Sequence, residues 1–228
     1  MGTITAIWNP RQAALKAAIA RADRFDEAMA LGLELHALAH ESAMTGGGGE
    51  ATIEDGLWDG LAEAACYHMP APDGLTIAWN IWHITRIEDL TANLLLADGA
   101  PLLDDAWLAR LGVAVRDTGN AMRPEEIAAF SRAIDVAALR AYRDAVGRRT
   151  REIIGALRAG DVKRKVASAG LARIQAEGGV AEGAEWLLEF WGGKTLAGIM
   201  LMPITRHQAV HLNDALRLKA QWARAARR

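Results

Sequence analysis

The chain has 228 residues, of which 51% are hydrophobic and 24% are charged, a composition typical of a soluble protein with a sizeable core. Its net charge of −2 argues against a nucleic-acid-binding surface, and its one cysteine, Cys66, excludes an internal disulfide framework. Because the sequence shows no signal-peptide pattern and no apolar run of membrane-spanning length, we expect one cytoplasmic domain over residues 1–228, without membrane or nucleic-acid partners.

Apolar residues recur at helical spacing and strand-like alternation is scarce, which predicts an all-α fold. The first long helix is expected over residues 9–40, with Asn9 as its N-cap and Pro10 at its first position. The glycine run at 46–49 predicts a loop, and a short helix is expected over residues 51–65.

Three further long helices are expected downstream, over residues 76–97, 136–157 and about 195–222. Thr76 and Asp135 are suitable N-caps for the second and third long helices. The long connection between these two helices allows them to run parallel. Four long helices with shorter helices in the crossings predict a four-helix bundle.

His207 and His211 lie four residues apart in the last expected helix. At 3.6 residues per turn their side chains project in nearly the same direction, so one helix can give two nitrogens to one metal ion. Pro203 is expected to kink the helix just before the pair. Gln208 stands where an HExxH metalloprotease has its catalytic glutamate, and an amide cannot take a proton from water, which excludes that activity.

His83 is the expected third ligand, because it lies on the inner stripe of the second long helix. Three imidazoles from two helices would leave coordination positions open, which is typical of a catalytic metal site. The alternative is that these histidines are core residues with ordinary hydrogen bonds. The paired spacing of His207 and His211 favours a metal, because two buried imidazoles both need partners.

Two segments, IAWNIWHITRIEDL and LMPITRHQAVHLNDALRLK, resemble those of the DinB-like superfamily of four-helix-bundle metalloproteins. The resemblance covers nearly the whole chain and maps the family's metal-binding histidines onto His83, His207 and His211. It implies an up-down-down-up bundle that forms a homodimer. Members with known activity resemble S-transferases that use thiols such as bacillithiol or mycothiol and a divalent metal, and others have been described as metal-dependent hydrolases.

His36 and His40 form a second pair at helical spacing, late in the first expected helix. If the first two long helices are antiparallel, His40 comes beside His83, where it could carry a proton or contact a substrate. The pair could also bind a second metal ion, or both histidines could be core residues with ordinary hydrogen bonds.

Several other polar residues have less specific roles. Asp214 could orient a ligand histidine, although solvated helix surface is the commoner place for such a residue. Glu88 and Asp89 are expected to form salt bridges with Arg86 or with arginines of the third long helix. Cys66 is expected to be a passive buried residue, because no sequence feature lowers its pKa.

These residues together predict a metal-dependent enzyme acting on a small molecule, with zinc as the first expectation and nickel or ferrous iron as alternatives. The leading hypothesis is a transferase whose metal activates a thiol cosubstrate, which Arg148, Arg149 or Arg151 could bind through carboxylates. One alternative is a hydrolase in which His40 or a carboxylate accepts the proton of a metal-bound water. Another is a non-catalytic stress-response module whose metal is structural or absent.

Overall fold

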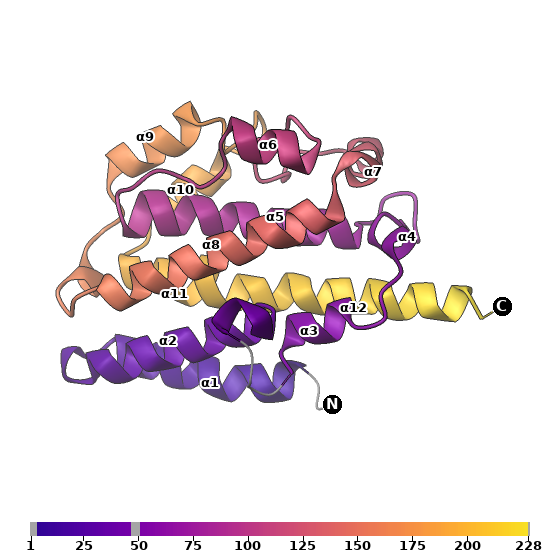
Figure 1. Ribbon diagram of the computed structural model, residues 1–228. Coiled ribbons are helices and arrows are strands. Elements are labelled where there is room, and N and C mark those ends of the chain that lie inside the picture. Colours follow the sequence, from indigo (N-terminus) through magenta and orange to yellow (C-terminus); the bar gives the residue numbers. More distant parts are fainter. Residues whose placement is uncertain (1–3, 47–50, 228) are drawn as a thin grey trace.

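The computed structural model describes residues 4–46 and 51–227 (Figure 1). These residues form helices joined by loops, with one isolated bridge between Lys165 and Thr195, which confirms the predicted all-α class. Residues 47–49 of the expected glycine loop lie outside the described part of the chain.

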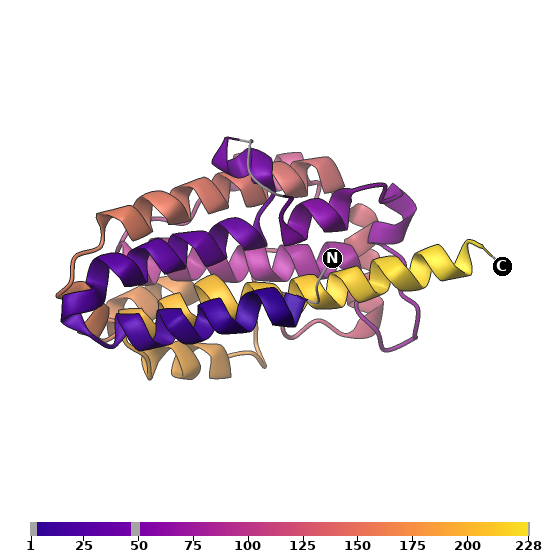
Figure 2. The same cartoon turned by 90° about the horizontal axis from the view of Figure 1, so that it is seen from below.

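The N-terminal segment is a pair of helices, so the prediction of a single helix over residues 9–40 is wrong. α1 (Ile4–Ile19) and α2 (Phe25–Ala39) pack against each other and are joined through the 3-10 turn η1 (Ala22–Arg24) (Figures 1 and 2). The break contains neither glycine nor proline. We attribute it to packing, because doubling back lets the two helices bury apolar residues against each other.

Pro10 lies inside α1 and not at its first position. A proline removes one backbone donor, and the turn around it is stabilised by burial of Trp8, whose Nε1 donates to Gln12 Oε1 at 3.0 Å. The expected N-cap at Asn9 is therefore also wrong, because α1 already begins at Ile4.

The second expected long helix is the central element of the fold. α5 (Ile77–Leu90) continues directly as the π-helix η3 (Thr91–Leu96), and every residue of both segments is buried. Thr76 is the N-cap as predicted, since its Oγ1 accepts a hydrogen bond from the backbone N of Trp79 at 3.0 Å.

The third long helix is α8 (Val136–Ala156), and Asp135 caps it as predicted. The last helical segment has three parts, α11 (Leu196–Leu201), the π-helix η5 (Met202–Arg206) and α12 (His207–Ala225). The irregularity expected around Pro203 is therefore present as a π-helical turn, because proline cannot donate the backbone bond that an α-helix needs.

The long helices α2, α5, α8 and α12 lie alongside one another, and α5 and α8 run in the same direction (Figure 1). Hydrogen bonds from Arg140 to Glu41 and from Arg151 to the carbonyl of Leu33 show that α8 is antiparallel to α2. α12 is antiparallel to α5, and this pair of helices brings the predicted histidines together.

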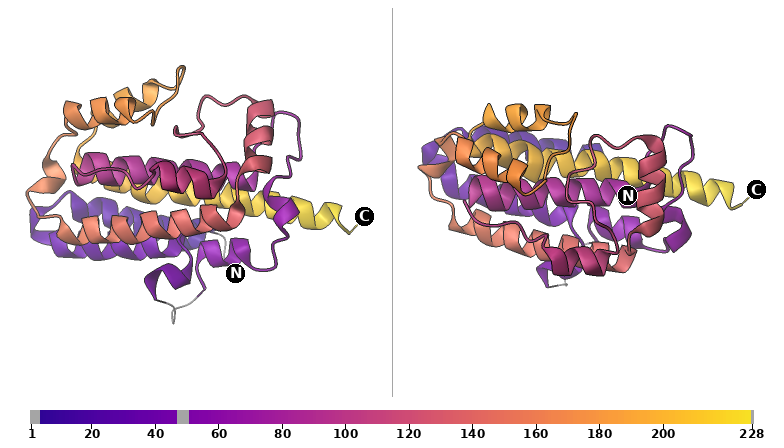
Figure 3. Two further views of the ribbon diagram at one scale, coloured as in Figure 1. Left: turned by 45° about the horizontal axis from the view of Figure 1, so that its top comes forward. Right: turned by 90° about the horizontal axis from the view of Figure 1, so that it is seen from above.

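Shorter helices surround this arrangement. α7 and α9 contact α5 and η3 on the side away from α1 and α2, which explains why no face of α5 reaches solvent (Figures 1 and 3). Among the described helices, none combines the length and apolarity that a bilayer crossing requires. The bounds of the short helices are α3 (Ile53–Trp58), α4 (Glu63–Cys66), α6 (Asp105–Leu111), α7 (Pro124–Ala133), α9 (Ser168–Ala176), α10 (Trp186–Gly192), η2 (Ser42–Thr45) and η4 (Asp161–Lys163).

Candidate metal centre

The structure brings His83 of α5 together with His207 and His211 of α12. One ring nitrogen from each histidine lies within 4.8 Å of the other two, and the Nε2 atoms of His83 and His207 are 3.2 Å apart. His83 is 2% exposed, whereas His207 and His211 are only partly buried. The three residues form a group that could hold one metal ion at a place with access to solvent.

The loop before α7 orients the His83 ring. His83 Nδ1 lies 2.7 Å from the carbonyl oxygen of Thr118, so Nδ1–H donates and Nε2 keeps its lone pair. The indole of Trp79 stacks on the His83 ring, with centroids 4.6 Å apart and planes inclined by 8°, and its Nε1 donates to the carbonyl of Gly119. Thr118 and Gly119 thus position His83 directly and through Trp79.

Asn80 orients the His211 ring from α5. Asn80 Oδ1 lies 2.8 Å from His211 Nδ1, while Asn80 Nδ2 donates to the carbonyl of Thr76. Because the amide nitrogen is already used, Oδ1 accepts from His211 Nδ1–H and the Nε2 lone pair of His211 stays free. Asp214, which its position in the sequence made a candidate for this role, instead forms an ion pair with Arg217.

His207 is placed by the π-helical turn η5, which ends immediately before it. Among the residues that the structure describes, no group bonds to its buried Nδ1 atom. The ring therefore has Nε2 directed at His83 and Nδ1 buried.

The three imidazoles are neutral near pH 7. Burial, together with the charge that His211 would carry, lowers the pKa of His83 to about 3. Burial lowers the pKa of His211 to about 4, and it holds the pKa of His207 well below its usual value. Neutral rings are the form in which histidine binds metals.

The spacing of the ring nitrogens fits a metal ion. Zinc–nitrogen bonds of about 2.0–2.1 Å at tetrahedral angles separate two ligand nitrogens by about 3.3 Å, close to the 3.2 Å between His83 and His207. A hydrogen bond from His207 to His83 would also fit that distance, but it would leave the Nε2 lone pair of His211 outside the interaction. A cation satisfies all three Nε2 atoms at once.

The second histidine pair does not join this centre. His36 and His40 are fully buried, and both bond to the carboxylate of Glu88, through His36 Nε2 at 2.7 Å and His40 Nε2 at 3.1 Å. The sequence predicted that His40 lies beside His83, and this is wrong. His40 lies against Glu88, which is five residues beyond His83 on α5.

A buried arginine lies near both groups of histidines. Arg143 of α8 is 1% exposed and donates to both oxygens of Glu54, to the carbonyl of Ala39 and to Gln208 Oε1. Gln208, the residue after His207, in turn donates to the carbonyl of Ile84. Gln208 therefore holds α5, α8 and α12 together and is a structural residue.

The other polar candidates have structural contacts. Asp89 accepts hydrogen bonds from Arg86 and Tyr142, which confirms the predicted salt bridge for Asp89. Glu88 pairs with two histidines and not with an arginine, so the salt bridge expected for it is wrong. Cys66 is buried, and burial raises the pKa of its thiol to about 11. Arg148 and Arg149 pair with acidic residues of α8, and Arg151 donates to α2.

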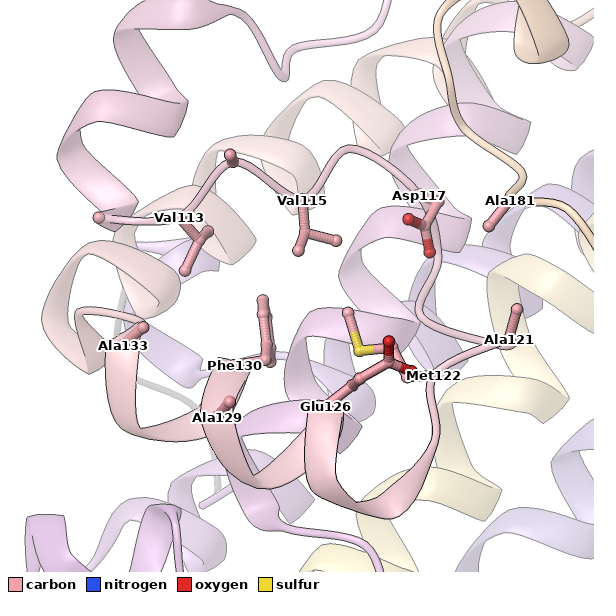
Figure 4. Close-up of a pocket in the computed structure, with 12 residues that line it drawn as sticks. Val113, Val115, Asp117, Ala121, Met122, Glu126, Ala129, Phe130, Ala133 and Ala181 are labelled. Carbon is pink, nitrogen blue, oxygen red and sulfur yellow. The ribbon is translucent and has the colours of Figure 1, made fainter.

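A cavity of about 610 Å³ lies between α7 and the segment before it (Figure 4). Val115, Met122 and Phe130 give it an apolar lining, and Asp117 and Glu126 also line it. None of the three histidines of the candidate metal centre lines it. This cavity is thus separate from the site where the chemistry is expected.

The sequence model of the DinB superfamily matches residues 54–215. The matched stretch contains His83, His207, His211 and Glu88 but neither α1 nor α2. No curated protein sequence matches the chain. Since the match extends over more than half of the sequence, the chain belongs to the DinB superfamily.

Proposed function

We propose that His83, His207 and His211 bind one divalent metal ion through Nε2 and that the protein is a metal-dependent S-transferase. The convergence of three neutral imidazoles at a partly exposed place carries this proposal. Zinc is the first choice, and nickel or ferrous iron suit the same ligands. A metal held there would lower the pKa of a thiol that binds it, which is the activation an S-transferase needs.

The residues behind the ligands would fix their orientation. Thr118 and Asn80 each accept from the Nδ1–H of a ligand ring, an arrangement that sets the tautomer and raises the basicity of the other nitrogen. Trp79 stacked on His83 would restrict rotation of that ring. These contacts preorganise the Nε2 atoms of His83 and His211 before any ion binds.

The reacting thiol would come from a cosubstrate. Cys66 is 1% exposed, its pKa is raised, and it does not belong to the three-histidine group. A cavity of about 220 Å³ is lined by Asn80, Asp214 and Arg217 and so adjoins the residue that orients His211. We propose that the cosubstrate extends from the metal into this cavity, where Arg217 would exchange its ion pair with Asp214 for one with the cosubstrate's carboxylate.

A metal-dependent hydrolase remains the alternative, with a non-catalytic metal-binding module as the third reading. General-base help in hydrolysis would need a group beside the metal-bound water, and His40, the candidate for this role, is enclosed against Glu88. A thiol is more acidic than water before it binds a metal, so a metal-bound thiol would release its proton to solvent more readily. This difference favours the transferase.

Metal content tests the first half of the proposal. Protein produced without a histidine tag would be analysed for metals, and wild type would be compared with His207→Ala and with His68→Ala. His68 stacks edge-on against Trp222 and has no place in the centre, which makes it the control. We expect His207→Ala alone to lose one metal ion per chain, and equal content in all three proteins would refute the proposal.

A conjugation assay tests the second half. Monochlorobimane would be offered as electrophile with bacillithiol, mycothiol or no thiol, to wild type and to His207→Ala. Turnover that requires both a thiol and His207 supports the transferase. Turnover of ester or amide substrates without a thiol would support the hydrolase, and metal binding without either activity would support the non-catalytic module.

The arrangement of the chain is also a proposal beyond the all-α class. We propose a single domain with an up-down-down-up four-helix bundle formed by α2, α5, α8 and α12, supported by the directions of these helices. A homodimer is proposed from family membership alone. Sedimentation equilibrium tests it, with a mass of one chain as the refuting result.

A further inference from the structure

A second group of possible metal ligands lies in the interior, formed by His36, His40 and Glu88. All three side chains are completely buried, and one ligand atom from each lies within 4.8 Å of the other two. The two imidazole rings stack, with centroids 4.3 Å apart. α2 supplies both histidines and α5 supplies the carboxylate, so the group joins these helices.

The carboxylate of Glu88 is the first evidence that this group holds a cation. In a completely buried place, its two oxygens lie 2.7 Å from His36 Nε2 and 3.1 Å from His40 Nε2. The nearby buried arginines are already paired, Arg86 with Asp89 and Arg143 with Glu54. Within the part of the chain that the structure describes, Glu88 therefore has only imidazoles as partners.

A proton on one imidazole could balance that charge, but the surroundings of His40 oppose this. The guanidinium of Arg143 bonds to the carbonyl of Ala39, the residue before His40, so a second positive charge beside it is unfavourable. Two imidazoles and one carboxylate are a ligand set that zinc and ferrous iron accept.

The ring orientations are the second line of evidence. In both histidines Nε2 faces the Glu88 carboxylate, whereas Nδ1 is buried without a hydrogen-bond partner among the described residues. The Nε2 atoms are therefore the ligands that a cation beside Glu88 would use.

The glycine at position 147 gives His40 its space. A Cβ atom at Gly147 would lie 2.7 Å from Nδ1 of His40, closer than any real contact. Glycine in a helix interior is less favourable than alanine, so keeping it at this position lowers helix stability. A larger residue there would displace the His40 ring from Glu88.

We infer that His36, His40 and Glu88 bind a second divalent metal ion in a closed site that stabilises the packing of α2 on α5. The site goes beyond the proposed function and does not depend on it. His83 and Glu88 are separated by about 7.5 Å along α5, whereas metals that act as a pair are about 3.5–4 Å apart. The buried ion is therefore structural.

Metal stoichiometry distinguishes this site from the first. Tag-free wild type, Glu88→Gln, His207→Ala and the double variant would be produced with zinc in the medium and analysed for metal per chain. We expect two ions in wild type, one in each single variant and none in the double variant. Wild-type content in Glu88→Gln would overturn the inference, whereas wild-type content in His207→Ala would overturn only the proposed function.

A second pair of variants covers the case in which Glu88→Gln does not fold. Gly147→Ala should lose one ion and Gly155→Ala should lose none, because a Cβ at Gly155 in the same helix meets no atom within 4 Å. Equal metal content in these two alanine variants would overturn the inference. A cobalt-substituted His207→Ala protein should still show d–d absorption, and a spectrum without it would have the same consequence.

Discussion

Replacing Arg143 by methionine should destabilise the protein severely. Arg143 is 1% exposed and makes hydrogen bonds to α2, α3, α5 and α12 through Ala39, Glu54, Thr85 and Gln208. Methionine fills similar space but leaves the Glu54 carboxylate buried with the Trp58 indole as its remaining donor. Removing one member of a buried ion pair costs about 3–5 kcal/mol of unfolding free energy.

In a chain of this length, that loss corresponds to a fall of about 6–20 °C in Tm. Urea unfolding followed by circular dichroism would measure it for Arg143→Met, Glu54→Met and the double variant. The double variant should be more stable than Arg143→Met by about 2 kcal/mol, because no charge is then left buried. A loss below about 1 kcal/mol in Arg143→Met, or no recovery in the double variant, would refute the reasoning.

The effect should also depend on pH. Burial raises the pKa of Glu54 from 4.5, and Arg143 opposes that rise. Without the arginine the folded-state pKa rises further, while the unfolded carboxyl still ionises near 4.5. The unfolded state then loses its proton first, so Arg143→Met should lose stability as pH rises above about 4.5, by up to about 1.4 kcal/mol per pH unit. The loss of unfolding free energy in Arg143→Met, relative to wild type, should be smaller at pH 5 than at pH 7.5.

Three further predictions concern single residues. Asn80→Ala should weaken metal binding about 10–100-fold in a chelator competition with the fold intact by circular dichroism, and unchanged affinity would contradict the role of Asn80. In metal-free protein, the pKa of His83 is about 3 in the folded state against 6.5 in the unfolded state. The free energy of unfolding should therefore fall by up to about 1.4 kcal/mol per pH unit as pH drops below 6.5, and His83→Gln should reduce this slope in urea titrations. Cys66 should react with Ellman's reagent at pH 8 at least about 100-fold more slowly in the folded protein than in guanidinium, because burial raises the pKa of its thiol from 9.0 to about 11. Comparable rates would show that the thiol is accessible.

The three-histidine group was predictable because its signal is local. Two histidines at helical spacing define a direction on one helix, and His83 on an apolar stripe defines the facing position on another. Helix ends marked by Thr76 and Asp135 were predictable for the same reason, since an N-cap acts within three residues.

Contacts between distant segments were not predictable from the sequence. The break between α1 and α2 has no glycine or proline, so only the burial of two facing helices accounts for it. The partners of Glu88 lie 48 and 52 residues away, and its neighbours in sequence suggested a salt bridge. Asn80 was missed because an asparagine on a buried helix face has no distinctive spacing.

The π-helical turn η5 sets the rotational phase of everything that follows it. A π-turn contains one residue more than an α-turn, and here the extra residue separates α11, whose Met200 packs near Gly32, from α12. If this segment formed a regular α-helix with all its residues kept, His207 and His211 would turn by about 100° relative to α11. Deleting one residue between Met202 and Arg206 would instead remove the extra residue together with the π-turn and keep the rotational phase. A homologue with a one-residue gap and a regular helix at this point would therefore keep both histidines in the centre.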